Sequence, residues 1–70
     1  MSIRITANEQ IESLRKDDTL IDMTNKKRPV RYSITFICTQ YVKVVSGIAK
    51  KTIRKIFPPK VLLSDEWYIE

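Results

Sequence analysis

The sequence predicts an α+β fold, a small winged helix-turn-helix domain preceded by an N-terminal strand, helix and hairpin. Apolar and small residues recur every three or four positions over residues 42–57, which is the period of a helix rather than of a strand. Gly47, the only glycine, stands between the two halves of this pattern, where a helix end favours a left-handed residue. Pro58-Pro59 would then stop the second helix. Two β-prone runs, 61–63 and 67–69, would follow as the hairpin called the wing.

The chain is expected to form a single domain over residues 1–70. Its 70 residues are fewer than the roughly 100–150 of a typical domain. We divide it into an N-terminal extension (1–37), the helix-turn-helix (38–57) and the wing (58–70). A chain this short buries only about 60% of its unfolded surface, so we expect the extension to complete the core and to offer a contact surface to a partner.

The start of the extension is expected to contain one strand and one helix. The isoleucines at positions 3 and 5 alternate with polar residues, which predicts a short strand. Thr6 or Asn8 would cap a helix over roughly residues 8–16, with Ile11 and Leu14 on its buried side.

The rest of the extension is expected to form a hairpin. Two β-rich runs, 19–23 and 30–37, flank a basic turn that ends at Pro29. Strict alternation divides the second run into two faces. One face would carry Val30, Tyr32, Ile34 and Phe36, and the other Arg31, Ser33 and Thr35.

The composition excludes several kinds of chemistry. One cysteine, Cys38, and no histidine allow no disulfide and no credible ligand set for zinc, haem or an iron–sulfur cluster. Catalysis by Ser-His or Cys-His pairs is excluded for the same reason. We therefore expect a protein that is not an enzyme and needs no metal or cofactor. Cys38 is interpreted as a small buried hydrophobe.

Membrane association is not expected. No apolar run approaches the roughly 20 residues of a membrane-spanning helix, and the first residues are not those of a signal peptide. No segment combines basic residues with Trp, Phe and Leu on one helical face, as an interfacial helix would. The expected location is the cytoplasm.

Positive charge is concentrated in the middle of the chain. Residues 1–25 carry three bases and five acids, and residues 61–70 carry three acids. Residues 26–60 carry ten bases and no acid. Such a stretch is the electrostatic signature of a polyanion-binding protein, in which each phosphate contact releases counterions.

The predicted helix-turn-helix assigns these bases to duplex DNA. Its second helix would lie in the major groove, with Lys51 and Arg54 at base edges and Thr52 at a thymine methyl or a phosphate. The other candidate DNA-binding residues, most of them bases that would neutralise phosphates, are Thr39, Gln40, Lys50, Lys55, Lys60, Lys26, Lys27 and Arg28.

Residues 36–59 also carry a specific order of motifs. The stretch opens Phe36-Ile37-Cys38-Thr39, continues to Gly47-Ile48-Ala49-Lys50-Lys51-Thr52-Ile53, and ends in Phe57-Pro58-Pro59. This order resembles the opening of the MerR-like DNA-binding domains of phage excisionases and AlpA-type regulators. The resemblance implies a winged helix-turn-helix that binds duplex DNA. Lys43, Ser46 and Ala49 depart from the Ala, Leu and Ser usual in that family, and residues 1–35 have no counterpart in it.

A second fold is compatible with the same sequence, a small all-β barrel of the SH3- or Sm-like kind with an N-terminal helix. Residues 8–16 would form the helix, and the strands would cover 19–24, 30–37, 41–46, 51–57 and 61–69. Such a barrel would suit an RNA-binding or protein-interaction module, with its bases on loops and strands. The period of residues 41–57 separates the two folds, and we interpret it as helical.

The predicted function is sequence-specific binding of duplex DNA, as an excisionase or a small transcriptional regulator. One module of this size has a small DNA interface, so a second copy of the chain or a recombinase is the expected protein partner. Two alternatives come from other classes. One is a small phage- or plasmid-type protein that binds and inhibits a host protein, and the other is an RNA-binding β-barrel.

Overall fold

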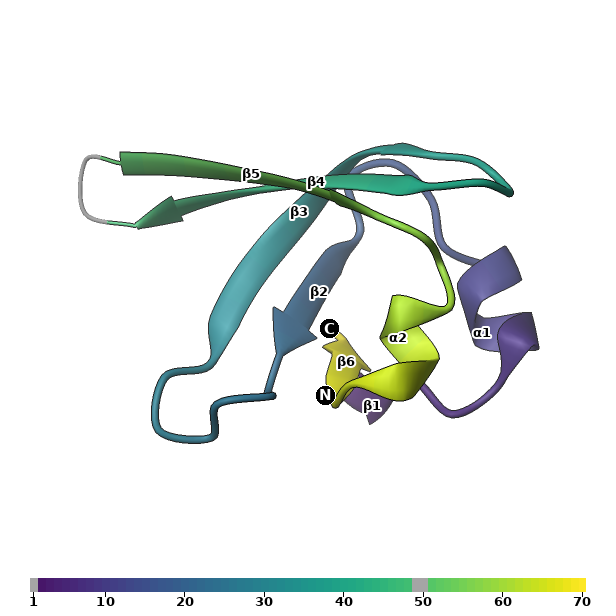
Figure 1. Cartoon of the computed structure of the whole chain (residues 1–70), viewed down its shortest axis with the longest axis horizontal. Coiled ribbons are helices and arrows are strands. Elements are labelled where there is room, and N and C mark those ends of the chain that lie inside the picture. Colours follow the sequence, from purple (N-terminus) through teal and green to yellow (C-terminus); the bar gives the residue numbers. More distant parts are fainter. Residues whose placement is uncertain (1, 49–50) are drawn as a thin grey trace.

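The computed structural model describes residues 2–48 and 51–70, and most of the regular structure in them is β-strand. Six strands form one antiparallel sheet in the order β1-β6-β2-β3-β4-β5, so that β1 and β5 are its edges (Figure 1). In chain order the elements are β1 (Ile3–Arg4), α1 (Asn8–Glu12), β2 (Thr19–Asp22), β3 (Val30–Ile37), β4 (Val42–Ile48), β5 (Lys51–Phe57), α2 (Val61–Ser64) and β6 (Trp67–Ile69).

The predicted helix-turn-helix is wrong. The residues expected to form its two helices form β4 and β5 instead, which pair with each other as an antiparallel hairpin. The many Val, Ile and Thr residues in this stretch explain the result, because β-branched side chains lose freedom in a helix and pack well on a pleated sheet. Val42, Val44 and Ser46 are buried, whereas Lys43 between them is exposed. The helical period in the sequence arises from apolar residues that lie on both faces of two strands.

The predicted turn and wing are also wrong. Gly47 lies within β4 opposite Thr52 and does not have a positive φ. Pro58-Pro59 does not end a helix but begins one, since the carbonyls of these prolines accept the N–H groups of Val61 and Leu62 in α2. β6 pairs with β1 and β2 rather than with the residues before it.

The strands of the alternative barrel lie closer to the observed ones. β3 and β5 have the expected bounds, and β2 and β4 differ from theirs by two residues or fewer at each end. The last expected strand, 61–69, is instead α2 followed by β6. The sheet is open, because within residues 2–48 and 51–70 β5 pairs with β4 alone.

The first helix is shorter than predicted. α1 has five residues and ends well before residue 16, and its N-cap is Ala7 rather than Thr6 or Asn8. Alanine offers no capping oxygen to the first turn, and the side chain of Gln10 instead reaches back to the residues before the helix. Its Oε1 accepts the backbone N–H groups of Thr6 and Ala7 at 2.6 and 3.0 Å. A capping glutamine at this third helical position holds the entry to the helix in place.

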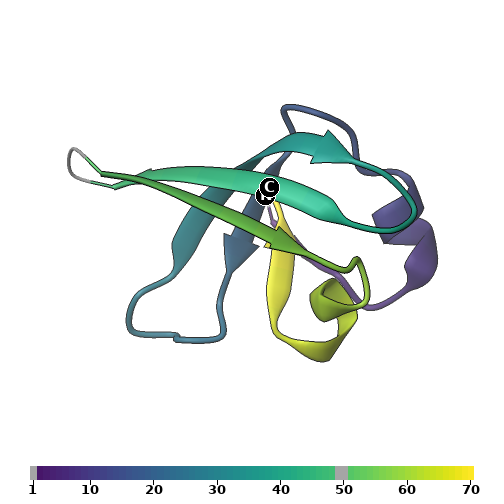
Figure 2. The same ribbon diagram turned by 45° about the horizontal axis from the view of Figure 1, so that its top comes forward.

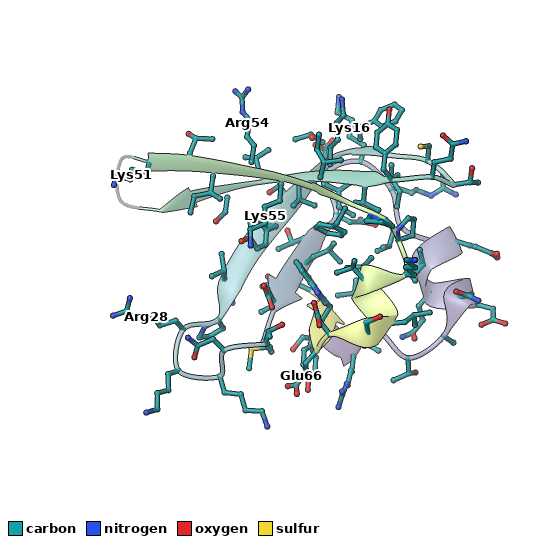
Figure 3. The ribbon with its side chains drawn as sticks, viewed as in Figure 1. Lys16, Arg28, Lys51, Arg54, Lys55 and Glu66 are labelled. Atoms are coloured by element: carbon teal, nitrogen blue, oxygen red, sulfur yellow. The ribbon has the colours of Figure 1, made fainter. Side chains whose placement is uncertain are left out.

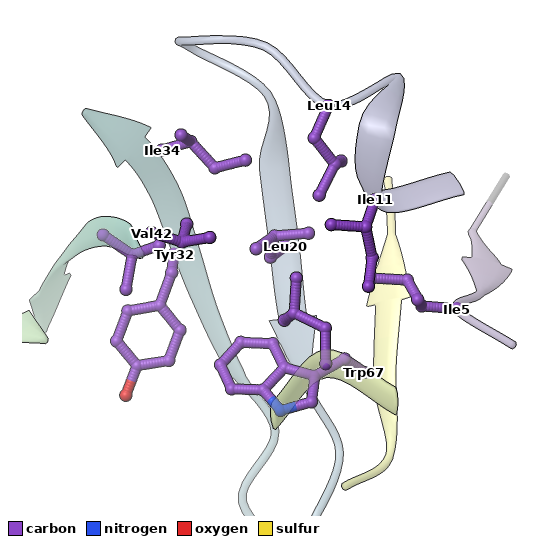
Figure 4. Close-up of a cluster of buried hydrophobic side chains, with 10 residues drawn as sticks. Ile5, Ile11, Leu14, Leu20, Tyr32, Ile34, Val42 and Trp67 are labelled. Carbon is purple, nitrogen blue, oxygen red and sulfur yellow. The ribbon is translucent and has the colours of Figure 1, made fainter. Parts of the chain in front are cut away.

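The hydrophobic core lies between one face of the sheet, here called the inner face, and the two helices (Figure 4). Leu20 and Tyr32 oppose each other across the β2–β3 hairpin, which forms as the sequence predicts. Ile11 of α1 and Leu62 of α2 pack onto the same face. The buried apolar residues are Ile5, Ile11, Leu14, Leu20, Tyr32, Ile34, Val42, Val44, Leu62 and Trp67.

The helices and the hairpin tips lie at opposite ends of the molecule. Figures 1 and 2 show α1 and α2 at one end, with the β2–β3 turn and the far end of the β4–β5 hairpin projecting from the other. Both helices pack on the inner face. The opposite face of β3, β4 and β5, here called the outer face, is therefore left without a helix over it.

Candidate nucleic-acid interface

A β-bulge at Thr35 determines which side chains reach the outer face. Ile34 opposes Val44 and Phe36 opposes Lys43, so Thr35 has no partner on β4. Its hydroxyl donates a hydrogen bond to the backbone carbonyl of Lys43 at 3.2 Å. The extra residue reverses the alternation of β3, as bulges commonly do where a side chain must be re-aimed. Phe36, predicted to share the face of Tyr32 and Ile34, is instead on the outer face and 47% exposed.

Phe36 belongs to a compact group of two rings and a cation. Its ring stacks on that of Tyr41, with centroids 5.6 Å apart and planes inclined by 28°. The Nζ atom of Lys43 lies 5.9 Å from the Phe36 centroid and 5.6 Å from that of Tyr41. The β3–β4 turn fixes Tyr41, whose carbonyl accepts the N–H of Cys38 at 3.1 Å. The two rings and the ammonium group therefore hold one another in position by stacking and cation–π attraction.

The register of β4 and β5 extends this group across the outer face. Ile56 opposes Lys43 and is 65% exposed, and Arg54 opposes Val45 one row further along. Gly47 and Thr52 form the next row, where a Cβ added to the glycine would meet nothing within 4 Å. The surface is thus open and low beyond Arg54. We call its main side chains the outer platform: Phe36, Tyr41, Lys43, Arg54 and Ile56.

Neither cation of the outer platform, Lys43 or Arg54, forms an ion pair with a carboxylate of the described chain. The one ion pair found among residues 2–48 and 51–70 joins Arg31 to Glu70 at 3.5 Å, and it involves neither Lys43 nor Arg54. Figure 3 shows Lys16 and Arg54 projecting from the same side of the molecule. Positive charge and exposed aromatic surface therefore coincide on this face.

The structure separates the residues that the sequence analysis grouped as one DNA-binding face. Thr39 and Gln40 are exposed in the β3–β4 turn, and Lys60 is the exposed N-cap of α2. Lys26, Lys27 and Arg28 are exposed in the turn between β2 and β3. Lys50 lies outside the described residues.

The remaining predicted residues lie on β5 and divide between its two faces. Lys55 opposes the buried Val44, so it lies on the inner face together with Lys51, four residues earlier. Thr52 and Arg54 alternate with them and lie on the outer face. A helix would have brought all four onto one surface, whereas a strand cannot.

Among the predicted residues, the outer platform contains Arg54 alone. The sequence analysis missed the other four residues of the platform, Phe36, Tyr41, Lys43 and Ile56. Phe36 and Ile56 are apolar and were interpreted as packing residues. The bulge that exposes Phe36 is not apparent in an alternating sequence pattern. The signal in the sequence is the close spacing of Phe36, Tyr41 and Lys43, two aromatics and a base around a turn.

Apart from the outer platform, the described chain has a sizeable cavity and no group of side chains suited to a metal ion. No group of three or more His, Cys, Asp and Glu residues suitable for a metal ion occurs in residues 2–48 and 51–70. An open, mostly apolar cavity of about 430 Å³ lies between α1, the β3–β4 turn and Pro59, with Ile11, Leu14 and Ile37 among its lining residues. None of the helices in these ranges is long and apolar enough to cross a membrane.

Comparison with known proteins gives no family for this chain. The two helices on which the resemblance to MerR-like domains depends are strands β4 and β5. No family model matches the sequence, and neither a curated protein nor a solved structure is similar to it.

Proposed function

We propose that this chain binds single-stranded nucleic acid on its outer platform, as a binding module rather than an enzyme. The observation that carries the proposal is the stacked and exposed ring of Phe36 beside the cations of Lys43 and Arg54. Exposed aromatic rings on a sheet surface, with lysine and arginine side chains around them, are typical of proteins that bind single-stranded nucleic acid.

The aromatic part of the platform favours unpaired bases. A duplex buries the faces of its bases against one another, whereas a single strand can bring a base against the exposed part of the Phe36 ring. Stacking of this kind contributes about 1–3 kcal/mol per base and tolerates any sequence. Ile56, 65% exposed and opposite Lys43, adds apolar surface next to the ring.

The cationic part supplies affinity for the backbone. Lys43 and Arg54 lie on neighbouring rows of the β4–β5 hairpin, so they can contact successive phosphates of a strand that runs along it. The stretch from residue 26 to residue 60 contains no acid that would repel such a strand. Binding is therefore expected to weaken as salt is added, through the loss of counterion release.

Introducing a negative charge at each of two matched isoleucines tests the proposal. Ile56→Glu changes an exposed residue of the platform, and Ile3→Glu changes an equally exposed residue on the edge strand β1 (65% and 60% exposed). Both variants alter the net charge by the same amount. Fluorescence anisotropy with labelled RNA and DNA single strands, and with a duplex of the same sequence, measures the affinity of each.

The proposal expects Ile56→Glu to lose most of its affinity for single strands while Ile3→Glu stays close to the parent chain. It also expects the parent to bind single strands more tightly than the duplex. Equal losses in the two variants, tighter binding of the duplex, or no binding at low salt would contradict it. The last outcome would favour the class of proteins that bind a host protein.

A further inference from the structure

We infer that the inner face carries a second, separate surface for nucleic acid, so that one copy of the chain bridges two strands. The inference rests on the proposed function of the outer platform and adds a second activity to it. We call this second surface the basic fork; its residues are Lys26, Lys27, Arg28, Lys51 and Lys55.

Strand register gives the first argument. Lys55 opposes the buried Val44, and Arg54 opposes Val45 on the other face. Because side chains alternate along a strand, Lys51 and Lys55 point to the inner face and Arg54 to the outer one. The bases of β5 are therefore divided between two surfaces rather than gathered on one.

Lys55 reaches across the inner face to an aromatic ring of β3. Its Nζ atom lies 5.5 Å from the centroid of the Tyr32 ring, on β3, although β4 separates the two strands. Two strand spacings are about 10 Å, a gap that a lysine and a tyrosine side chain close by leaning toward each other over the inner face. The lysine itself is exposed, so its charge stays accessible beside the ring.

The β2–β3 turn supplies the other half of the basic fork. Figures 1 and 2 show this turn and the adjoining ends of β4 and β5 at the same end of the molecule, and Figure 3 shows Arg28 and Lys51 there, with Lys55 further toward the middle of the molecule. The N–H of Arg28 donates to the carbonyl of Asn25 at 3.0 Å, which closes the turn. The nearby acid Asp22 makes a local hydrogen bond, because its Oδ1 accepts the backbone N–H of Thr24 at 2.9 Å.

The sheet keeps the two surfaces apart. A sheet with its side chains is about 10 Å thick, and no helix packs on the outer face to join the surfaces. Charges on opposite faces are separated by about one Debye length at physiological salt. One phosphate cannot contact both faces, so each can hold a strand of its own.

A capture assay tests this inference. One single strand is immobilised on beads, and a fluorescent strand that is not complementary to it is captured through the protein. The variant K26S/K27S/R28S removes three charges from the basic fork, and F36A/K43A damages the outer platform. Anisotropy with one strand is measured in parallel for each protein, and Trp67 fluorescence checks that each is folded.

The inference expects the parent chain to capture the second strand. K26S/K27S/R28S should lose most of this capture, about tenfold or more, and bind one strand within about threefold of the parent. F36A/K43A should lose capture and most of its affinity for one strand, and the binding that remains should come from the basic fork. Binding of one strand without capture by the parent would overturn the inference and leave the proposed function intact. Capture that survives in K26S/K27S/R28S would also overturn it, since bridging would then come from two associated copies. No binding of any strand would overturn both.

Discussion

The rings of Phe36 and Tyr41 stack with their centroids 5.6 Å apart, and they join the end of β3 to the start of β4. This contact depends on the bulge at Thr35, because without the change of register Phe36 would not oppose Lys43. A local irregularity in one strand thus turns a residue with the sequence pattern of a core position into the centre of an exposed surface.

Replacing Phe36 with alanine should weaken binding of single strands and leave the fold intact. A lost base stack is worth about 1–3 kcal/mol, or roughly 5- to 150-fold in affinity. Phe36 is 47% exposed, so its removal should lower the free energy of unfolding only slightly. Leu63→Ala, at an exposed residue of α2, is the control and should bind like the parent. Similar affinities for the two variants in anisotropy titrations would argue against stacking on this ring.

The salt dependence of binding should report individual phosphate contacts. For a single strand the slope of log K against log salt is about −0.7 per neutralised phosphate. Lys43→Ala should therefore make the slope less steep by about 0.7, whereas Lys60→Ala, at the N-cap of α2, should not change it. A slope that responds to Lys60 and not to Lys43 would contradict the position of the platform.

Loss of the Thr35 hydroxyl should destabilise the bulge. Thr35→Val keeps the shape and the β-branching of the side chain but removes its 3.2 Å hydrogen bond to the carbonyl of Lys43. A single hydrogen bond of this kind contributes about 0.5–1.5 kcal/mol. Urea unfolding followed by the fluorescence of Trp67, the only tryptophan, measures the change. Unchanged stability would mean that the backbone alone holds the bulge.

Asp17 adopts a conformation that suits glycine better than most residues. Its φ is 76°, and its N–H donates to the carbonyl of Ile34 at 2.8 Å. Asp17→Gly should keep or raise the free energy of unfolding, by up to about 1 kcal/mol. Asp17→Val should lower it by about 1–2 kcal/mol or more, since β-branched residues are strained at positive φ. Equal melting temperatures for the two variants would refute this account of the turn.

Leu62 should be essential for folding although α2 is a helix of only four residues. Its side chain is fully buried against the inner face. Truncation of such a leucine to alanine costs about 2–5 kcal/mol, and a chain of this size is stable by only about 3.5–10 kcal/mol. Leu63→Ala, at the exposed neighbouring residue, should cost much less. Circular dichroism melts of the two variants should differ widely, and closely similar melts would contradict the packing described for α2.

The sequence allowed some elements to be predicted because their signals are local. The β2–β3 hairpin was predicted from two β-rich runs around a basic turn with Pro29. Residues 42–57 were wrongly predicted to be helical because Val45, Ile53 and Ile56 are apolar but lie outside the buried cluster. Counting them as core residues gave the spacing of a helix.

The candidate site was harder to predict, because it depends on pairing between strands. Basic residues were identified as the polyanion-binding feature, but the expected helix placed Arg54 and Lys55 on one surface, whereas a strand divides them between opposite faces. The exposure of Phe36 depends on a one-residue slip against β4, and no residue type in Ile34-Thr35-Phe36 marks that slip.

The most direct test of the central claim is to map a bound single strand on the protein by two-dimensional ¹H–¹⁵N NMR. We expect the largest shift changes, at low concentrations of an unstructured oligonucleotide, at Phe36, Tyr41, Lys43, Arg54 and Ile56. Shift changes at residues of the β2–β3 turn should appear only at higher oligonucleotide concentrations, when a second strand binds to the same protein molecule. Shift changes that begin in that turn, or that centre on α1 and α2 and spare Phe36, would contradict the assignment of the outer platform as the nucleic-acid site.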